Sequence, residues 1–257
     1  MEFLGSLISV EIFVVACVIA VVGGFIKGAV GFAMPLVMVS LLGIFLEPQL
    51  VVAGIILPIV TTNFLQIIRA GWTEAFSALR EYRIFVGLMV VMIFVSAQFL
   101  TRIPSDIMRI VLGIPVMALC LVQLMGLRLV IAPKYRMFFS TIAGILAGIL
   151  GGLAGTWGPP TVLYLLAVET PKARQMAVQG VIYGVGAVAL LIGHLQSGVL
   201  NWQTAPFSAS LIPPALLGMW LGFKLGARLD QEKFRKMTLI VLAVAGANLI
   251  RRGLIGD

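Results

Sequence analysis

Two glycine-rich segments, each ending in proline, carry the strongest chemical signal in the sequence. Both follow the pattern G-x3-G-x2-G-x3-P at a constant offset of 124 residues: Gly24, Gly28, Gly31 and Pro35, then Gly148, Gly152, Gly155 and Pro159. Glycine inside a helix costs about 1 kcal/mol relative to alanine, so three at fixed spacing either allow close helix packing or break the helix. The proline favours a break, and the N-terminus of a helix that starts there attracts anions. We therefore expect two helix N-termini at one anion site.

Lys27 lies inside the first of these segments, well into an apolar run. A lysine there is costly unless it meets an anion or snorkels to an interface, and both explanations stay open. Its counterpart in the second segment is Gly151, so the repeat does not require the charge. Thr156 and Trp157 could offer a hydroxyl and an indole donor to a substrate, or could serve packing and interface anchoring alone.

Further polar side chains fall in the third apolar run of each half. We expect them to line the same cavity, although polar groups in lipid can also bond neighbouring helices. They are Thr61, Thr62, Asn63 and Gln66, then Gln179 and Tyr183. The predicted substrate-binding residues are Lys27, Gly28, Gly31, Pro35, Asn63, Gly152, Gly155, Thr156, Trp157, Pro159 and Gln179.

No pattern in the sequence favours catalysis. It has no P-loop, no His-Glu-x-x-His helix and no Ser/His/Asp arrangement on a soluble domain, and no carboxylate lies at the centre of an apolar run. His194 is the single histidine and is more typical of a helix-to-helix bond than of a proton relay. Cys17 and Cys120 lie in apolar runs and indicate core residues rather than metal ligands. We expect no enzyme activity, no cofactor and no metal.

Composition sets the class of protein. Apolar residues make up 61% of the 257 residues, charged residues 11%, and the mean hydropathy is +1.12. That leaves too little polar surface for a water-soluble domain of this size, so the lipid bilayer is the expected solvent. The net charge of +8 does not indicate nucleic-acid binding, because the basic residues lie at the ends of apolar runs.

The apolar runs predict an all-α membrane protein with ten segments. Their approximate ranges are 7–27, 32–46, 50–68, 84–101, 107–125, 137–155, 159–169, 175–196, 206–226 and 234–251. Two are short, because only about eleven residues separate Pro35 from Glu47 and Pro159 from Thr170. At about 1.5 Å per residue neither can cross a bilayer alone, so we expect half-helices.

Three sequence similarities indicate an internal repeat of five segments. Besides the glycine segments, residues 71–75 resemble 201–205, and residues 102–109 resemble 228–235. The predicted units are residues 1–128 and 129–257, together forming one membrane domain. Because five is odd, the second unit enters the membrane in the opposite orientation, and such an inverted repeat is typical of carriers with alternating access.

Lysine and arginine counts predict the orientation. With ten crossings, thirteen of these residues fall on one side, against four on the other: Arg102, Arg109, Arg251 and Arg252. The positive-inside rule places the richer side in the cytoplasm and both termini outside. The first segment has no basic residues before it, so we do not expect a cleaved signal peptide.

Residues Gly23–Leu36 (GGFIKGAVGFAMPL) and Gly151–Pro160 (GGLAGTWGPP) resemble the paired signatures of the TauE/SafE sulfite exporter family. The likeness extends over essentially the whole chain and includes the Asp106/Arg109 linker. It implies transport of sulfite, an organosulfonate or a related sulfur compound across a bacterial or archaeal inner membrane. Lys27 interrupts a run that many members fill with glycine, which leaves the substrate open. An anion channel and a non-transporting membrane scaffold are the alternatives, and a homodimer is compatible with the sequence.

Overall fold

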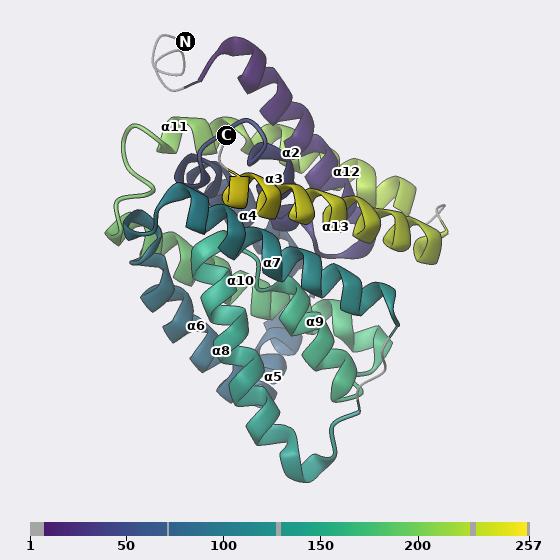
Figure 1. Cartoon of the computed structure of the whole chain (residues 1–257). Coiled ribbons are helices and arrows are strands. Elements are labelled where there is room, and N and C mark those ends of the chain that lie inside the picture. Colours follow the sequence, from purple (N-terminus) through teal and green to yellow (C-terminus); the bar gives the residue numbers. More distant parts are fainter. Residues whose placement is uncertain (1–7, 71, 127–129, 227–229, 256–257) are drawn as a thin grey trace.

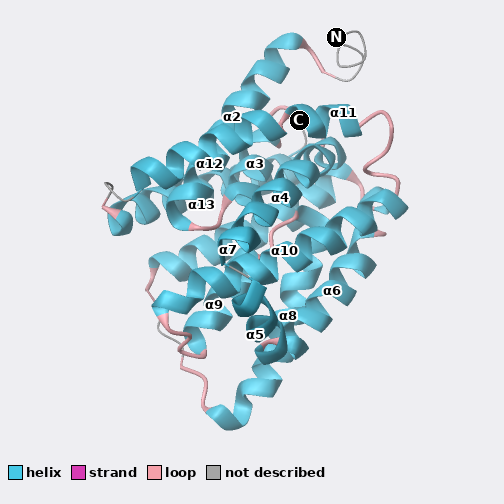
Figure 2. Cartoon of the chain, turned by 180° about the vertical axis from the view of Figure 1, so that it is seen from behind, coloured by secondary structure: helices cyan, strands magenta, loops and turns pink. Residues whose placement is uncertain are grey.

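The computed structural model describes residues 8–70, 72–126, 130–226 and 230–255, and within these ranges the chain is helical without strands (Figures 1 and 2). Helices satisfy every backbone polar group internally, which a lipid environment demands. Eight helical stretches in these ranges are long and apolar enough to cross a membrane: Val10–Val30, Pro48–Ile68, Arg83–Arg102, Ser105–Leu124, Pro133–Ala154, Ala177–Gln196, Ala205–Gly226 and Lys236–Ile255. The all-α prediction is confirmed, and the protein has several candidate membrane spans.

The helices follow the same order in the two halves of the chain. The first half contains α2 (Val10–Val30), α3 (Met34–Leu42), α4 (Pro48–Ala70), α5 (Trp72–Glu81), α6 (Arg83–Ala97), η1 (Leu100–Arg102) and α7 (Ser105–Leu124). The second contains η2 (Pro133–Tyr135), α8 (Arg136–Ala154), α9 (Gly158–Ala167), α10 (Lys172–Gln196), α11 (Ala205–Ser210), α12 (Ile212–Gly226) and α13 (Gln231–Ile255). Helices α9 and α10 each begin 124 residues after α3 and α4. The predicted boundary at residues 128 and 129 lies outside the described residues.

Helices α3 and α9 are the two short segments that the sequence predicts. They contain nine and ten residues, which corresponds to roughly 14–15 Å of helix. The hydrocarbon core of a bilayer is about 30 Å thick, so neither helix can span it alone.

Each half of the chain packs mainly against the other half. The most extensive helix contacts are α2 with α12, α6 with α8, α7 with α13, and α4 with α10. Two motif glycines make such contacts close: a Cβ atom on Gly28 would lie 2.3 Å from the Met219 carbonyl oxygen of α12, and one on Gly152 would lie 2.1 Å from Ser96 Oγ of α6. The halves are therefore interlocked and share one core.

A charge cluster of four residues joins the halves near α5, which lies in the lower part of both overall views (Figures 1 and 2). Arg174 Nε lies 2.5 Å from Glu74 Oε1 and its Nη1 lies 2.5 Å from Glu81 Oε2, while Arg136 Nη2 lies 2.9 Å from Glu81 Oε1. Partial burial raises the pKa of Glu81, but the hydrogen bonds and charges of Arg174 and Arg136 lower it further, so the net shift is downward. The carboxylates come from the first half and the guanidinium groups from the second.

Candidate functional site

The third glycine of each motif ends a helix. Gly31 has a φ of 85° and caps α2, and Gly155 has a φ of 64° and caps α8. Their N–H groups donate to the carbonyl oxygens of Lys27 and Gly151, at 2.8 and 2.6 Å. Left-handed backbone is readily adopted by glycine alone, so the helix ends where this glycine falls. The predicted helix breaks are confirmed.

The motif prolines then start the short helices. Pro35 is the second residue of α3, and Pro159 is the second residue of α9. Proline is tolerated there because the first turn of a helix has no internal acceptor for its N–H groups. The two breaks therefore expose one helix N-terminus from each half.

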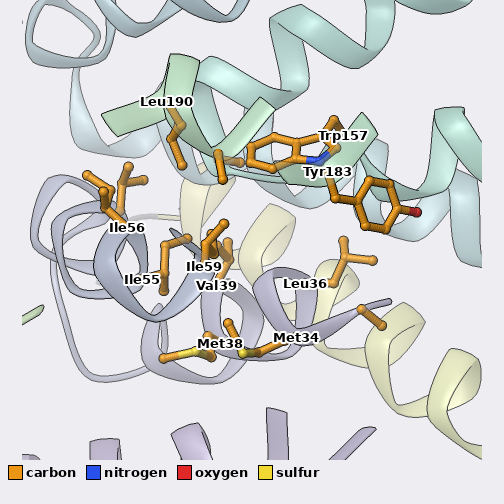
Figure 3. Packing of buried hydrophobic residues seen from close by; sticks show 14 of the residues in the cluster. Met34, Leu36, Met38, Val39, Ile55, Ile56, Ile59, Trp157, Tyr183 and Leu190 are labelled. Atoms are coloured by element: carbon orange, nitrogen blue, oxygen red, sulfur yellow. The ribbon is translucent and has the colours of Figure 1, made fainter. Parts of the chain in front are cut away.

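Both breaks border one partly open cavity with about 310 Å³ of space between its atoms, only a small part of which is wide enough for water. Its lining comes from the two motif turns, α4 and α10: Lys27, Phe32, Ala33, Pro35, Leu36, Asn63, Gly155, Thr156, Trp157, Gly158, Pro159 and Tyr183. In Figure 3, Trp157 and Tyr183 lie on the opposite side of the buried cluster from Met34 and Met38 of α3. Segments more than a hundred residues apart thus meet at one point.

Seven of the predicted site residues line this cavity: Lys27, Pro35, Asn63, Gly155, Thr156, Trp157 and Pro159. The other four lie elsewhere. Gly28 and Gly152 face the backbones of α12 and α6, and the Gly31 carbonyl oxygen accepts a hydrogen bond from Gln66 Nε2 at 2.9 Å. Gln179 is buried on α10 away from the lining.

Ala33 is a lining residue that the motif did not identify. Its φ of 80° is left-handed, although it carries a Cβ atom, and it immediately precedes α3. Such a conformation is strained for a non-glycine residue and persists only where the surroundings hold it. Alanine is not a residue type that predicts a left-handed turn or a binding role, so sequence reasoning could not identify this position.

Lys27 is 2% exposed and does not snorkel to an interface. Its Nζ donates to Thr62 Oγ1 at 3.0 Å and to Asn63 Oδ1 on α4. Asn63 Nδ2 donates to the Tyr183 carbonyl oxygen at 3.2 Å, which turns the amide oxygen toward the lysine. The described lining contains no carboxylate, so the Lys27 amine has only neutral partners. An uncompensated buried cation is expensive and favours an anion beside it.

A family model described as "Sulfite exporter TauE/SafE" matches residues 16–249. The chain belongs to the TauE/SafE sulfite exporter family. Searches of curated proteins and of solved structures returned no match. Membership of this transporter family, together with the eight apolar spans, makes the chain a multi-pass membrane protein. The family resemblance of the two glycine signatures is confirmed.

The two halves of this TauE/SafE protein differ at the cavity. Gly151 and Gly186 stand 124 residues after Lys27 and Thr62. A Cβ atom on Gly151 would lie 3.0 Å from Trp157 Cε3, and one on Gly186 would lie 3.1 Å from Trp157 Cε2. The indole therefore packs against the two glycines whose positions correspond in sequence to the lysine and its hydroxyl partner. The described lining holds one lysine and no second basic side chain.

His194 of the TauE/SafE chain lies outside the cavity lining and is fully buried. Its Nε2 pairs with the Gly152 carbonyl oxygen of α8 at 2.9 Å, and its Nδ1 pairs with Ser197 Oγ at 3.2 Å. The residue forms the helix-to-helix bond that its isolation in the sequence favoured. Among the described residues, no group of three His, Cys, Asp or Glu side chains could hold a metal ion.

Proposed function

We propose that the protein is a secondary transporter that moves a small sulfur-containing anion, of the sulfite or organosulfonate class, by alternating access. The observation that carries this proposal is Lys27, whose buried amine has only neutral partners and lies beside the two helix N-termini. Sulfite and sulfonates present compact oxyanions that ammonium and backbone N–H groups bind well. Membership of a sulfite exporter family supports the same substrate class.

The donors around the cavity favour a position of the anion near α3. Helix α9 begins Gly158-Pro159-Pro160, and its two prolines carry no N–H group. Helix α3 has one proline in its first turn, and Thr62, the hydroxyl partner of Lys27, lies 3.9 Å from Met34 Sδ at the start of α3. The anion therefore meets Lys27 and the α3 N-terminus, while Trp157 and Tyr183 form the opposite wall.

Alternating access follows if the halves are inverted copies. Helix packing supports this relation. In chain order α2 corresponds to α8 and α6 corresponds to α12, and α2 packs on α12 while α8 packs on α6. A twofold axis in the membrane plane would repeat each contact between the halves in this way. We place ten segments in an inner membrane, with the charge cluster in the cytoplasm and both termini outside.

Flux into proteoliposomes tests the proposal. We expect saturable uptake of radiolabelled sulfite or of a small alkanesulfonate, absent from empty liposomes. Absence of saturable uptake for both anion classes would refute a transporter of this kind. Non-saturating flux with single-channel currents would instead identify an anion channel.

A further inference from the structure

We propose that Lys27 couples one proton to each anion that the protein carries, an inference that rests on the proposed anion transport. The lysine amine is neutral while the cavity is empty and becomes an ammonium ion when an anion enters. Anion and proton then cross together and leave together.

The hydrogen bonds of Lys27 fit both protonation states. A neutral amine has two N–H donors and one lone pair, and the described residues supply two acceptors, Thr62 Oγ1 and Asn63 Oδ1. The Thr62 hydroxyl donates its own hydrogen bond to the Pro58 carbonyl oxygen at 2.7 Å, and the Asn63 amide donates to the Tyr183 carbonyl oxygen. Both oxygens are therefore held as acceptors. The third position on Nζ is a lone pair in the neutral amine and an N–H donor in the ammonium ion.

Among the described residues, neither the hydrogen-bond partners of Lys27 nor the cavity lining carries a charge that balances it. Helix α3 has no titratable residue, α4 contributes Thr62 and Asn63, and the one titratable residue of α12, Lys224, is exposed over the Trp220 ring. Tyr183 of α10 is the other titratable group in the described lining, and its hydroxyl donates to the Gly158 carbonyl oxygen at 3.2 Å. A phenol is neutral at neutral pH, so the ammonium ion is stabilised only when an anion joins it.

The proton balance is simple. On the entry side, the Nζ lone pair binds a proton from water as the anion arrives, and the third N–H bond points to an anion oxygen. On the exit side, the N–H bond breaks, the electron pair stays on nitrogen and the proton leaves to water with the anion. One monoanion and one proton cross per cycle without net charge. The counterpart of Lys27 is Gly151, so the repeat supplies no second proton.

The test is proton uptake on binding, measured with a pH dye in weakly buffered detergent solution. Methanesulfonate is the first probe, because it carries no titrating proton near neutral pH. We expect the wild type to take up about one proton per anion bound. Lys27→Arg keeps a cation that cannot deprotonate, so the proton uptake per anion that this variant binds should be zero. If only sulfite binds, the proton uptake of Lys27→Arg is subtracted from that of the wild type. The difference excludes the protons that sulfite itself takes up or releases.

A second variant and the binding measurement itself separate failure of the proton coupling from failure of the transport proposal. Asn63→Asp places a carboxylate beside Lys27 and holds it charged, so this variant should also lose proton uptake even if Lys27→Arg fails to fold. Wild-type binding without proton uptake, or equal uptake in the variants, overturns the coupling and leaves the transport proposal intact. Failure of the wild type to bind either anion overturns both.

Discussion

At the residue scale, the site depends on a single buried lysine. Lys27 has neutral partners from α4, and the indole of Trp157 packs against Gly151, the residue 124 positions further along the chain. A hydrogen bond to a charged group contributes about 1.5–3 kcal/mol, which corresponds to roughly 10–100-fold in affinity. One lysine can therefore decide whether an anion binds.

Lys27→Met should lower sulfite flux by about 10–100-fold for that reason. The melting temperature of this variant should change little, because removing a buried polar amine offsets the loss of its hydrogen bonds to Thr62 and Asn63. Lys224→Met is the matched control, since Lys224 is exposed on α12, and it should retain flux. Undiminished flux in Lys27→Met would contradict the role given to the lysine.

Two substitutions of Ala33 test whether the backbone is strained at the start of α3. Ala33→Gly should stabilise the protein by about 1 kcal/mol, because glycine adopts a φ of 80° without a Cβ clash. Ala33→Val should destabilise it, since a β-branched residue tolerates this conformation least. Thermal unfolding in detergent measures both changes, and the same sign for the two variants would show that the backbone is not strained there.

At the element scale, each motif divides its glycines between two tasks. Gly28 and Gly152 allow helices to approach closely, while Gly31 and Gly155 end α2 and α8. This division places the helix ends at the cavity and the helix shafts against the opposite half. The packing and helix-breaking explanations of the motif are therefore both correct, at different positions.

Gly28→Val should prevent correct folding or cost at least about 1–3 kcal/mol, because its Cβ would lie 2.3 Å from a backbone oxygen of α12. Gly87→Val on α6 is the control, since a Cβ there would meet nothing within 4 Å beyond its chain neighbours and the adjacent backbone of its own helix. Size-exclusion profiles and melting temperatures report the difference. Equal behaviour of the two variants would mean that α2 and α12 do not pack this closely.

At the scale of the whole molecule, the two halves hold each other in place. Helix pairs from opposite halves form the core, and the charge cluster of Glu74, Glu81, Arg136 and Arg174 joins the halves near α5. The alternating access that we propose would therefore shift contacts between the halves rather than within one of them. Ion pairs at a partly exposed edge suit such a contact, because each contributes little and can re-form.

Glu81→Gln should lower stability at pH 7 by about 0.5–1 kcal/mol. The folded-state pKa of Glu81 lies below its ordinary value, so this stability is present above the unfolded value of about 4.3 and is lost as pH falls through the folded pKa. The difference in melting temperature between wild type and Glu81→Gln should therefore shrink on acidification. A difference that stays constant down to about pH 3 would exclude this cause.

Hydropathy and residue spacing by themselves determined the membrane class, the helical content, the family signatures and the positions of both short helices. These features are local, because left-handed glycine and first-turn proline act within a few residues of themselves. Only the tertiary structure decided that Gly28 packs while Gly155 lines the cavity, that Lys27 meets Asn63, and that Ala33 is strained. Those outcomes depend on how each helix is rotated against partners far away in sequence, and that rotation is set by side-chain packing between segments.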